Sequence, residues 1–171
     1  KGDQHPTLHA QFDLSLQVLG QELQASGADP QPLPTALHDL SHAPACGVGD
    51  RLGMEIAGLE ATGYALLIEE ARDLHLVDAF HPPATDWSFG RDPQARPSRR
   101  VVRVRPLFAD WLRQHAENSD GLDRMTEWFL HRLPRPMRDD PRLDDRPGPW
   151  QDLQDERDAL IDWLSRVPES R

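Results

Sequence analysis

The stretch RLGMEIAGLEATGYALLIEEARDLHLVDAF (residues 51–80), followed after a proline-rich loop by RRVVRVRPLFADWL (residues 99–112), decides the fold expected for this chain. Residues 48–60 have a helical pattern, and Thr62 can cap a longer helix that follows. Residues 76–80 and the RRVVRVR segment then alternate between apolar and polar positions, as half-buried strands do. The pattern predicts two helices joined by a tight turn and then a β-hairpin with a long, irregular tip.

Further helices are predicted on both sides of this region. Apolar residues at helical spacing predict a helix over residues 7–26, and Gly27 is a suitable stop. Pro34 can open a second, short helix. Pro106 is well placed as the first residue of another helix, and a further one ends at Pro134. The chain is therefore mainly α-helical, with one small hairpin.

Three parts follow from this reading. Residues 1–133 form the helical domain, residues 134–149 form an arm too rich in proline and charge for regular structure, and residues 150–171 form a C-terminal helix. At 171 residues the chain has room for one core-bearing domain of ordinary size.

The order helix, short helix, helix, turn, helix, strand, wing, strand, helix resembles that of winged helix-turn-helix proteins, in particular MarR-like regulators, over residues 48–113. The resemblance implies a winged-helix-like domain with additional N- and C-terminal helices. It also implies that residues 62–74 form the recognition helix and that the chain binds DNA, or that the fold serves as a protein-docking module.

Charge is distributed unevenly between the two halves of the chain. Residues 1–90 contain 3 basic and 13 acidic side chains, whereas residues 91–171 contain 16 of each, so the net charge of −10 lies in the first half. An arginine-rich stripe follows directly on the acidic half. Its candidate nucleic-acid or partner-binding residues are Arg91, Arg96, Arg99, Arg100, Arg103 and Arg105. They could contact phosphates, or they could neutralise the acidic half or a second copy of the chain.

The expected recognition helix does not have the charge that DNA binding requires. It contains Glu69, Glu70 and Asp73 against a single Arg72. Because phosphates repel carboxylates, a standard major-groove mode is not favoured. In the loop between the strands, Trp87 and Phe89 have little local core to join, so they are candidate anchors for a partner.

Histidines provide the only candidate metal ligands of note. His38 and His42 are four residues apart and would share one helix face, with Cys46 nearby as a third ligand. The spacing is a variant of HExxH, with Asp39 in the place of the catalytic glutamate, but Pro44 breaks the helix before Cys46. Surface or capping histidines are the simpler interpretation. We predict no catalytic residues, no metal and no cofactor.

No apolar run approaches the roughly 20 residues that span a bilayer, so we expect no membrane partner. The single cysteine favours a reducing compartment, the cytoplasm. The function expected from these features is that of a non-catalytic regulator or adaptor that binds a protein partner, with possible nucleic-acid contact through the wing and possible homodimerisation. Two alternatives stay open: a DNA-binding transcriptional regulator, and an acidic immunity- or antitoxin-type protein that neutralises a basic partner.

Overall fold

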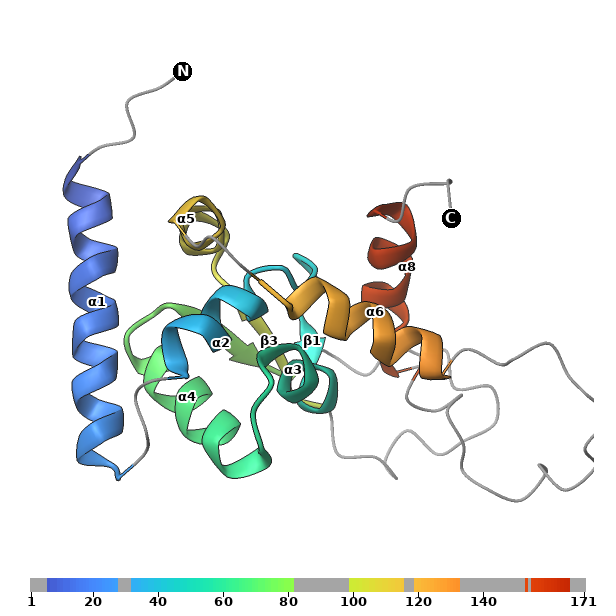
Figure 1. Cartoon of the computed structure of the whole chain (residues 1–171), viewed down its shortest axis with the longest axis horizontal. Helices are drawn as coiled ribbons and strands as arrows, with labels where there is room; N and C mark the ends of the chain where they lie inside the picture. Colours follow the sequence, from blue (N-terminus) through green and yellow to red (C-terminus); the bar gives the residue numbers. More distant parts are fainter. Residues whose placement is uncertain are drawn as a thin grey trace, which may run out of the picture.

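The computed structural model describes residues 6–27, 32–81, 99–115, 119–132, 153 and 155–166, and they form a mainly helical protein with a small antiparallel sheet (Figure 1). In chain order the elements are α1 (Pro6–Ala25), α2 (Leu33–Leu40), β1 (Val48–Gly49), α3 (Asp50–Ala57), α4 (Ala61–Asp73), β2 (Val77–Phe80), β3 (Val101–Val104), α5 (Pro106–His115), α6 (Gly121–Arg132) and α8 (Arg157–Arg166). The predicted fold class, mainly α with a small hairpin, is confirmed.

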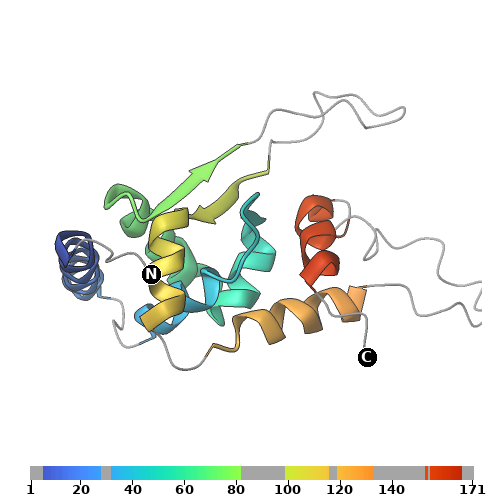
Figure 2. The ribbon, with the colours of Figure 1, turned by 90° about the horizontal axis from the view of Figure 1, so that it is seen from above.

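The sheet has the strand order β1-β3-β2, so β3 lies between two edge strands (Figure 2). β2 and β3 pair antiparallel, with Asp78 opposite Arg103, which is the predicted hairpin. β1 also pairs antiparallel with β3, and Val48 lies opposite Val102. The prediction of a helix over all of residues 48–60 was therefore wrong at both ends, since α3 also stops at Ala57. Val48 is fully buried and Gly49 is extended, with ψ of 163°, so the helix begins only at Asp50.

The second predicted helix start also differs from the structure. Glu60, in an extended conformation, is the N-cap residue of α4, whereas Thr62 lies inside the helix and is exposed. The Glu60 carboxylate makes no capping hydrogen bond. The helix forms because Tyr64, Leu67, Ile68 and Ala71 repeat at helical spacing and are all buried.

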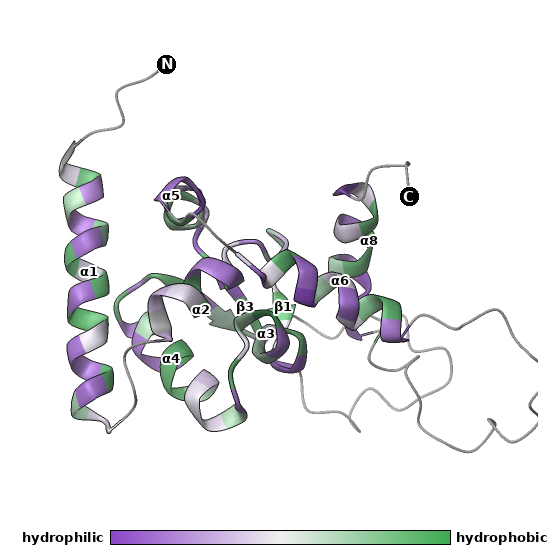
Figure 3. Cartoon of the chain, viewed as in Figure 1, coloured by the Kyte–Doolittle hydropathy of each residue, from purple (hydrophilic) through white to green (hydrophobic). Residues whose placement is uncertain are grey.

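One core joins the helices to the inner face of the sheet. Its largest fully buried side chains include Tyr64, Phe108 and Phe129. Helix α1, whose apolar and polar residues alternate around it (Figure 3), joins the core through Leu19 and Leu23. The Phe12 ring lies 5.1 Å from the Phe108 ring, centroid to centroid, which ties α1 to α5.

The C-terminal helix packs on α6. Trp163 is buried, its ring centroid lies 5.2 Å from that of Phe129, and its indole N–H donates to the Thr126 hydroxyl at 3.0 Å. Trp111 and Trp128 are also buried. The predicted arm, residues 134–149, lies outside the described residues. Among the described helices, none is long and apolar enough to cross a membrane.

The end of α4 provides a testable position. His75 has a φ of +59°, in the left-handed region, and the next amide, that of Leu76, donates to the Ala71 carbonyl at 2.8 Å. This is a helix C-terminus at which glycine is usual, because a Cβ is unfavourable there. We expect His75→Gly to raise the free energy of unfolding by about 0.5–1 kcal/mol, as measured by urea denaturation. His75→Val, with a branched Cβ, should lower it, and equal effects of the two variants would contradict this account.

Candidate interaction surfaces

The outer face of the hairpin is built from two arginines that share one carboxylate. Arg103 donates to one Asp78 oxygen at 2.9 Å, and Arg105 donates to the other at 3.0 Å. Arg103 also lies over the Phe80 ring, 5.7 Å from its centroid. The hydrogen bond from Arg103, together with that from Arg105, lowers the pKa of Asp78. Asp78 is therefore ionised at neutral pH and balances part of the arginine charge.

Arg99 is held by a carboxylate from the far end of the sequence. Glu156, only 5% exposed, accepts the Gly49 backbone N–H at 3.1 and 3.3 Å with its two oxygens and forms an ion pair with Arg99. Burial raises the pKa of Glu156, and the Arg99 charge partly opposes that rise. A side chain on Gly49 would collide with the Arg99 guanidinium, so glycine is needed for this close approach. The contact links the C-terminal segment to β1 and to the base of the hairpin.

The neighbouring Arg100 is also paired within the chain. Its Nε donates to both oxygens of Asp50, each at 3.0 Å. Arg113, further along, pairs with Asp110 and donates to the Ser41 carbonyl. Four of the six predicted stripe residues, Arg99, Arg100, Arg103 and Arg105, therefore each contact a carboxylate of this chain. The other two, Arg91 and Arg96, and the predicted anchors Trp87 and Phe89 lie outside the described residues.

The outward face of α4 is acidic. Glu69 and Asp73 are exposed, one helical turn apart, and Thr62 lies on the same face two turns earlier. The one arginine, Arg72, contacts Asp73 at 3.4 Å. Two of the three acidic residues predicted to dominate the charge of this helix, Glu69 and Asp73, are thus on its surface, where a charged partner can reach them, and the third, Glu70, is half-buried.

A groove lies beside the hairpin, at the end of α4. It has a volume of about 600 Å³. Its walls are the turn after α4, the length of β2 and two arginines of β3; the lining residues are Arg72, Asp73, His75, Val77, Asp78, Ala79, Phe80, Arg103 and Arg105. Three arginines and two aspartates line it, together with the rings of His75 and Phe80.

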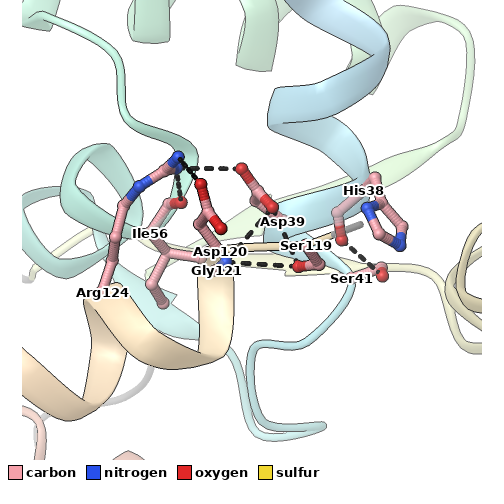
Figure 4. A network of polar contacts seen from close by, with 8 residues as sticks. All are labelled: His38, Asp39, Ser41, Ile56, Ser119, Asp120, Gly121 and Arg124. Carbon is pink, nitrogen blue, oxygen red and sulfur yellow. Dashed lines mark hydrogen bonds and ion pairs between the residues drawn. The ribbon is translucent and has the colours of Figure 1, made fainter. Parts of the chain in front are cut away.

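Asp39 organises a buried polar network where α2, α3 and α6 meet (Figure 4). One of its oxygens accepts from the Ser119 hydroxyl at 2.9 Å and from the Gly121 N–H at 3.2 Å, so it caps the start of α6. Its other oxygen accepts from Arg124 at 2.9 Å, and Arg124 also donates to the Ile56 carbonyl at 2.8 Å. The role of Asp39 is therefore structural, and the sequence had suggested it only as a variant of a catalytic glutamate.

The candidate metal ligands lie close to this network but do not converge. The ring centroids of His38 and His42 are 5.2 Å apart, and the rings pack edge to face. Burial lowers the pKa of His42, and the charge of His38 lowers it further. Cys46 is exposed as a residue, but its thiol is partly buried, and this burial raises the pKa of the thiol, which disfavours the nucleophilic thiolate. Within the described parts of the chain, no group of three histidine, cysteine or acidic side chains could hold a metal.

Tyr64 has a hydroxyl that is buried with no hydrogen-bond partner among the described residues. It lies against Gly53, where a Cβ would collide with it, and burial raises the pKa of the phenol. Because removing a hydroxyl that has no partner removes no hydrogen bond, we expect Tyr64→Phe to change the free energy of unfolding by less than about 0.5 kcal/mol or to raise it. Urea denaturation measures this, and a loss of more than about 1 kcal/mol would show that the hydroxyl is satisfied.

These features describe a helical protein with a small sheet, an acidic helix face and arginines bound to its own carboxylates. Comparisons with protein-family models, curated proteins and solved structures found no match to this chain.

Proposed function

We propose that this chain is a non-catalytic, protein-binding regulator or adaptor on a winged-helix framework. The order α2, β1, α3, α4, β2, β3, with a three-stranded sheet, supports the winged-helix part of the proposal. In that framework α4 occupies the position of the recognition helix. The acidic outward face of α4, formed by Glu69 and Asp73, is the observation that carries the proposal, because it favours a basic protein surface over a phosphate backbone.

The ion pairs of the hairpin support the same conclusion. A guanidinium that already contacts a carboxylate contributes less to phosphate binding, because that carboxylate repels the phosphate at short range. Arg99, Arg100 and Arg103 each have such a carboxylate. The described part of the wing is therefore close to neutral, although its sequence is strongly basic.

The partner test compares two charge-reversal variants of equal size. Glu69→Lys with Asp73→Lys changes the α4 face, and Asp123→Lys with Glu127→Lys makes the same change on exposed residues of α6. A protein captured by the wild type should be retained by the α6 variant, lost with the α4 variant, and released by salt. Equal capture by all three forms would rule out the α4 face as the binding surface.

Duplex DNA provides the opposing test. We expect fluorescence anisotropy of a labelled random DNA duplex to show no binding of this chain, even at low salt. Binding with a steep salt dependence, lost on replacing Arg99, Arg100 and Arg103 by alanine, would establish phosphate contacts and favour a transcriptional regulator instead.

The acidic face also favours one second candidate, an immunity- or antitoxin-type protein that covers a basic site on its partner. The pull-down separates the two roles, because a neutralising protein should inhibit the activity of the protein it captures. We also propose that the protein is cytoplasmic and that it can form a homodimer.

A further inference from the structure

The two edges of the sheet differ in how their backbone groups are used. In an antiparallel pair, residues alternate between those whose N–H and C=O face the partner strand and those whose groups face away from it. The Arg105 N–H donates to the carbonyl of Leu76, the residue before β2, at 3.0 Å, and Asp78, two residues on, lies opposite Arg103, so the backbone groups of Leu76 and Asp78 face β3. The backbone groups of Val77 and Ala79 therefore point outward, along the free edge of β2.

The corresponding groups of β1 are covered. Val48 and Gly49 pair with Val102 and Val101, and the Gly49 N–H points away from β3, where both oxygens of Glu156 accept it. The C-terminal segment thus closes this edge of the sheet. No described residue does the same for β2, which is the outermost strand on the side away from β1 (Figure 2).

The free edge of β2 borders the groove of about 600 Å³, and the groove has unused hydrogen-bonding capacity. Arg103 donates to Asp78 through one terminal nitrogen, and its Nε is buried without a partner among the described residues. Arg72 is half exposed on the opposite wall. Asp78 already accepts from two arginines, which leaves guanidinium donors in excess of acceptors along the groove.

We propose that β2 accepts an extended, acidic segment of a protein partner as a fourth strand. The outward N–H and C=O groups of Val77 and Ala79 form the new ladder, as in other cases of strand addition. Because side chains alternate along a strand, every second residue of the segment lies on the outer face of the sheet, next to Asp78 and Phe80 of β2. The guanidinium groups of Arg103 and Arg105 extend from β3 to Asp78, and a carboxylate of the segment can accept from the N–H groups that Asp78 leaves unused. The proposal rests on the proposed function in that the partner is a protein. Its backbone contacts are on β2, although the groove beside that strand shares Asp73 with the α4 face.

The test uses the full chain and a fluorescein-labelled heptapeptide of alternating valine and glutamate, with a valine and lysine heptapeptide as the control. We expect saturable binding of the glutamate peptide, none of the lysine peptide, and slower hydrogen exchange at the Val77 and Ala79 amides when the glutamate peptide is bound. Failure here leaves the α4 pull-down result unchanged, so the two proposals fail separately.

Proline at position 79 removes the outward N–H without removing a bond to β3, because Ala79 faces away from that strand. We expect Ala79→Pro to raise the peptide Kd about tenfold or more, whereas Ala79→Ser, which keeps the N–H, changes it less than about twofold. Circular dichroism melts check that both variants are folded. If the proline variant does not fold, Arg103→Gln replaces it, with the same loss of affinity expected.

Three results would overturn the proposal. They are absence of binding by the glutamate peptide, binding that leaves exchange at Val77 and Ala79 unchanged, and self-association of the free chain that protects these two amides. The last result would assign the β2 edge to a second copy of the chain.

Discussion

Replacing Asp39 by alanine is expected to lower the free energy of unfolding by about 3 kcal/mol. The carboxylate is fully buried on α2 and makes three contacts at α6: it caps the helix at Gly121, accepts from Ser119, and binds Arg124. Its loss leaves the start of α6 without this cap and removes the buried partner of the Arg124 charge. Urea denaturation followed by circular dichroism, with the m-value checked for constancy, measures the change.

Asp120→Ala is the matched control for this variant. Asp120 also contacts Arg124, at 3.5 Å, but its side chain is 76% exposed. Solvent screens that pair, so we expect a change of less than about 0.5 kcal/mol. If both variants lose the same amount of stability, the network does not depend on the burial of Asp39 and this account is wrong.

Replacing Trp163 by alanine is expected to weaken docking of the C-terminal segment by about 3 kcal/mol. The indole is buried against Phe129 and bonds to Thr126, and these contacts hold α8 on α6. Because α8 packs on the outside of the fold, we expect the loss to appear as local opening. Amide exchange in residues 157–166 should become roughly a hundredfold faster.

The control is Ile161→Ala, on the exposed side of the same helix, where the side chain is 54% exposed. Its effect on exchange should be less than about threefold. Amides in α4 report on the core, and their exchange should change little in either variant. If Trp163→Ala accelerates exchange in α4 and α8 equally, the segment and the core unfold as one unit and the local description fails.

The hairpin and the long helices could be predicted because each has a periodic signal of its own. Val102 and Val104 alternate with Arg103 and Arg105, and the buried residues of α4 repeat at helical spacing. β1 could not be found in this way, because two residues have no period. Val48–Gly49 is a strand only because β3 offers it backbone partners, and that pairing arises from tertiary structure.

In the candidate interaction surfaces, too, the contacts that follow from local pairing could be predicted, and those that depend on tertiary structure could not. Once the hairpin register is known, Asp78 opposite Arg103 follows from cross-strand pairing, so this ion pair could have been anticipated. The pairing of Glu156 with Arg99 and Gly49 could not, because the carboxylate comes from a segment 107 residues beyond Gly49 and no local pattern identifies it among 29 acidic residues. Neutralisation of the acidic half was one of the two roles that the sequence predicted for the arginine stripe, but the sequence did not identify the carboxylates involved.

The late position of Glu156 has a consequence for the chain as it is synthesised. The sheet can form once Val104 has been added, but the side chain that covers the β1 edge comes 52 residues later. At about 5–20 residues per second, the nascent chain carries an unprotected β1 edge for roughly 3–10 s. During that interval the backbone of Gly49 can pair with another nascent chain, so translation pauses between the codons for Val104 and Glu156 would favour aggregation.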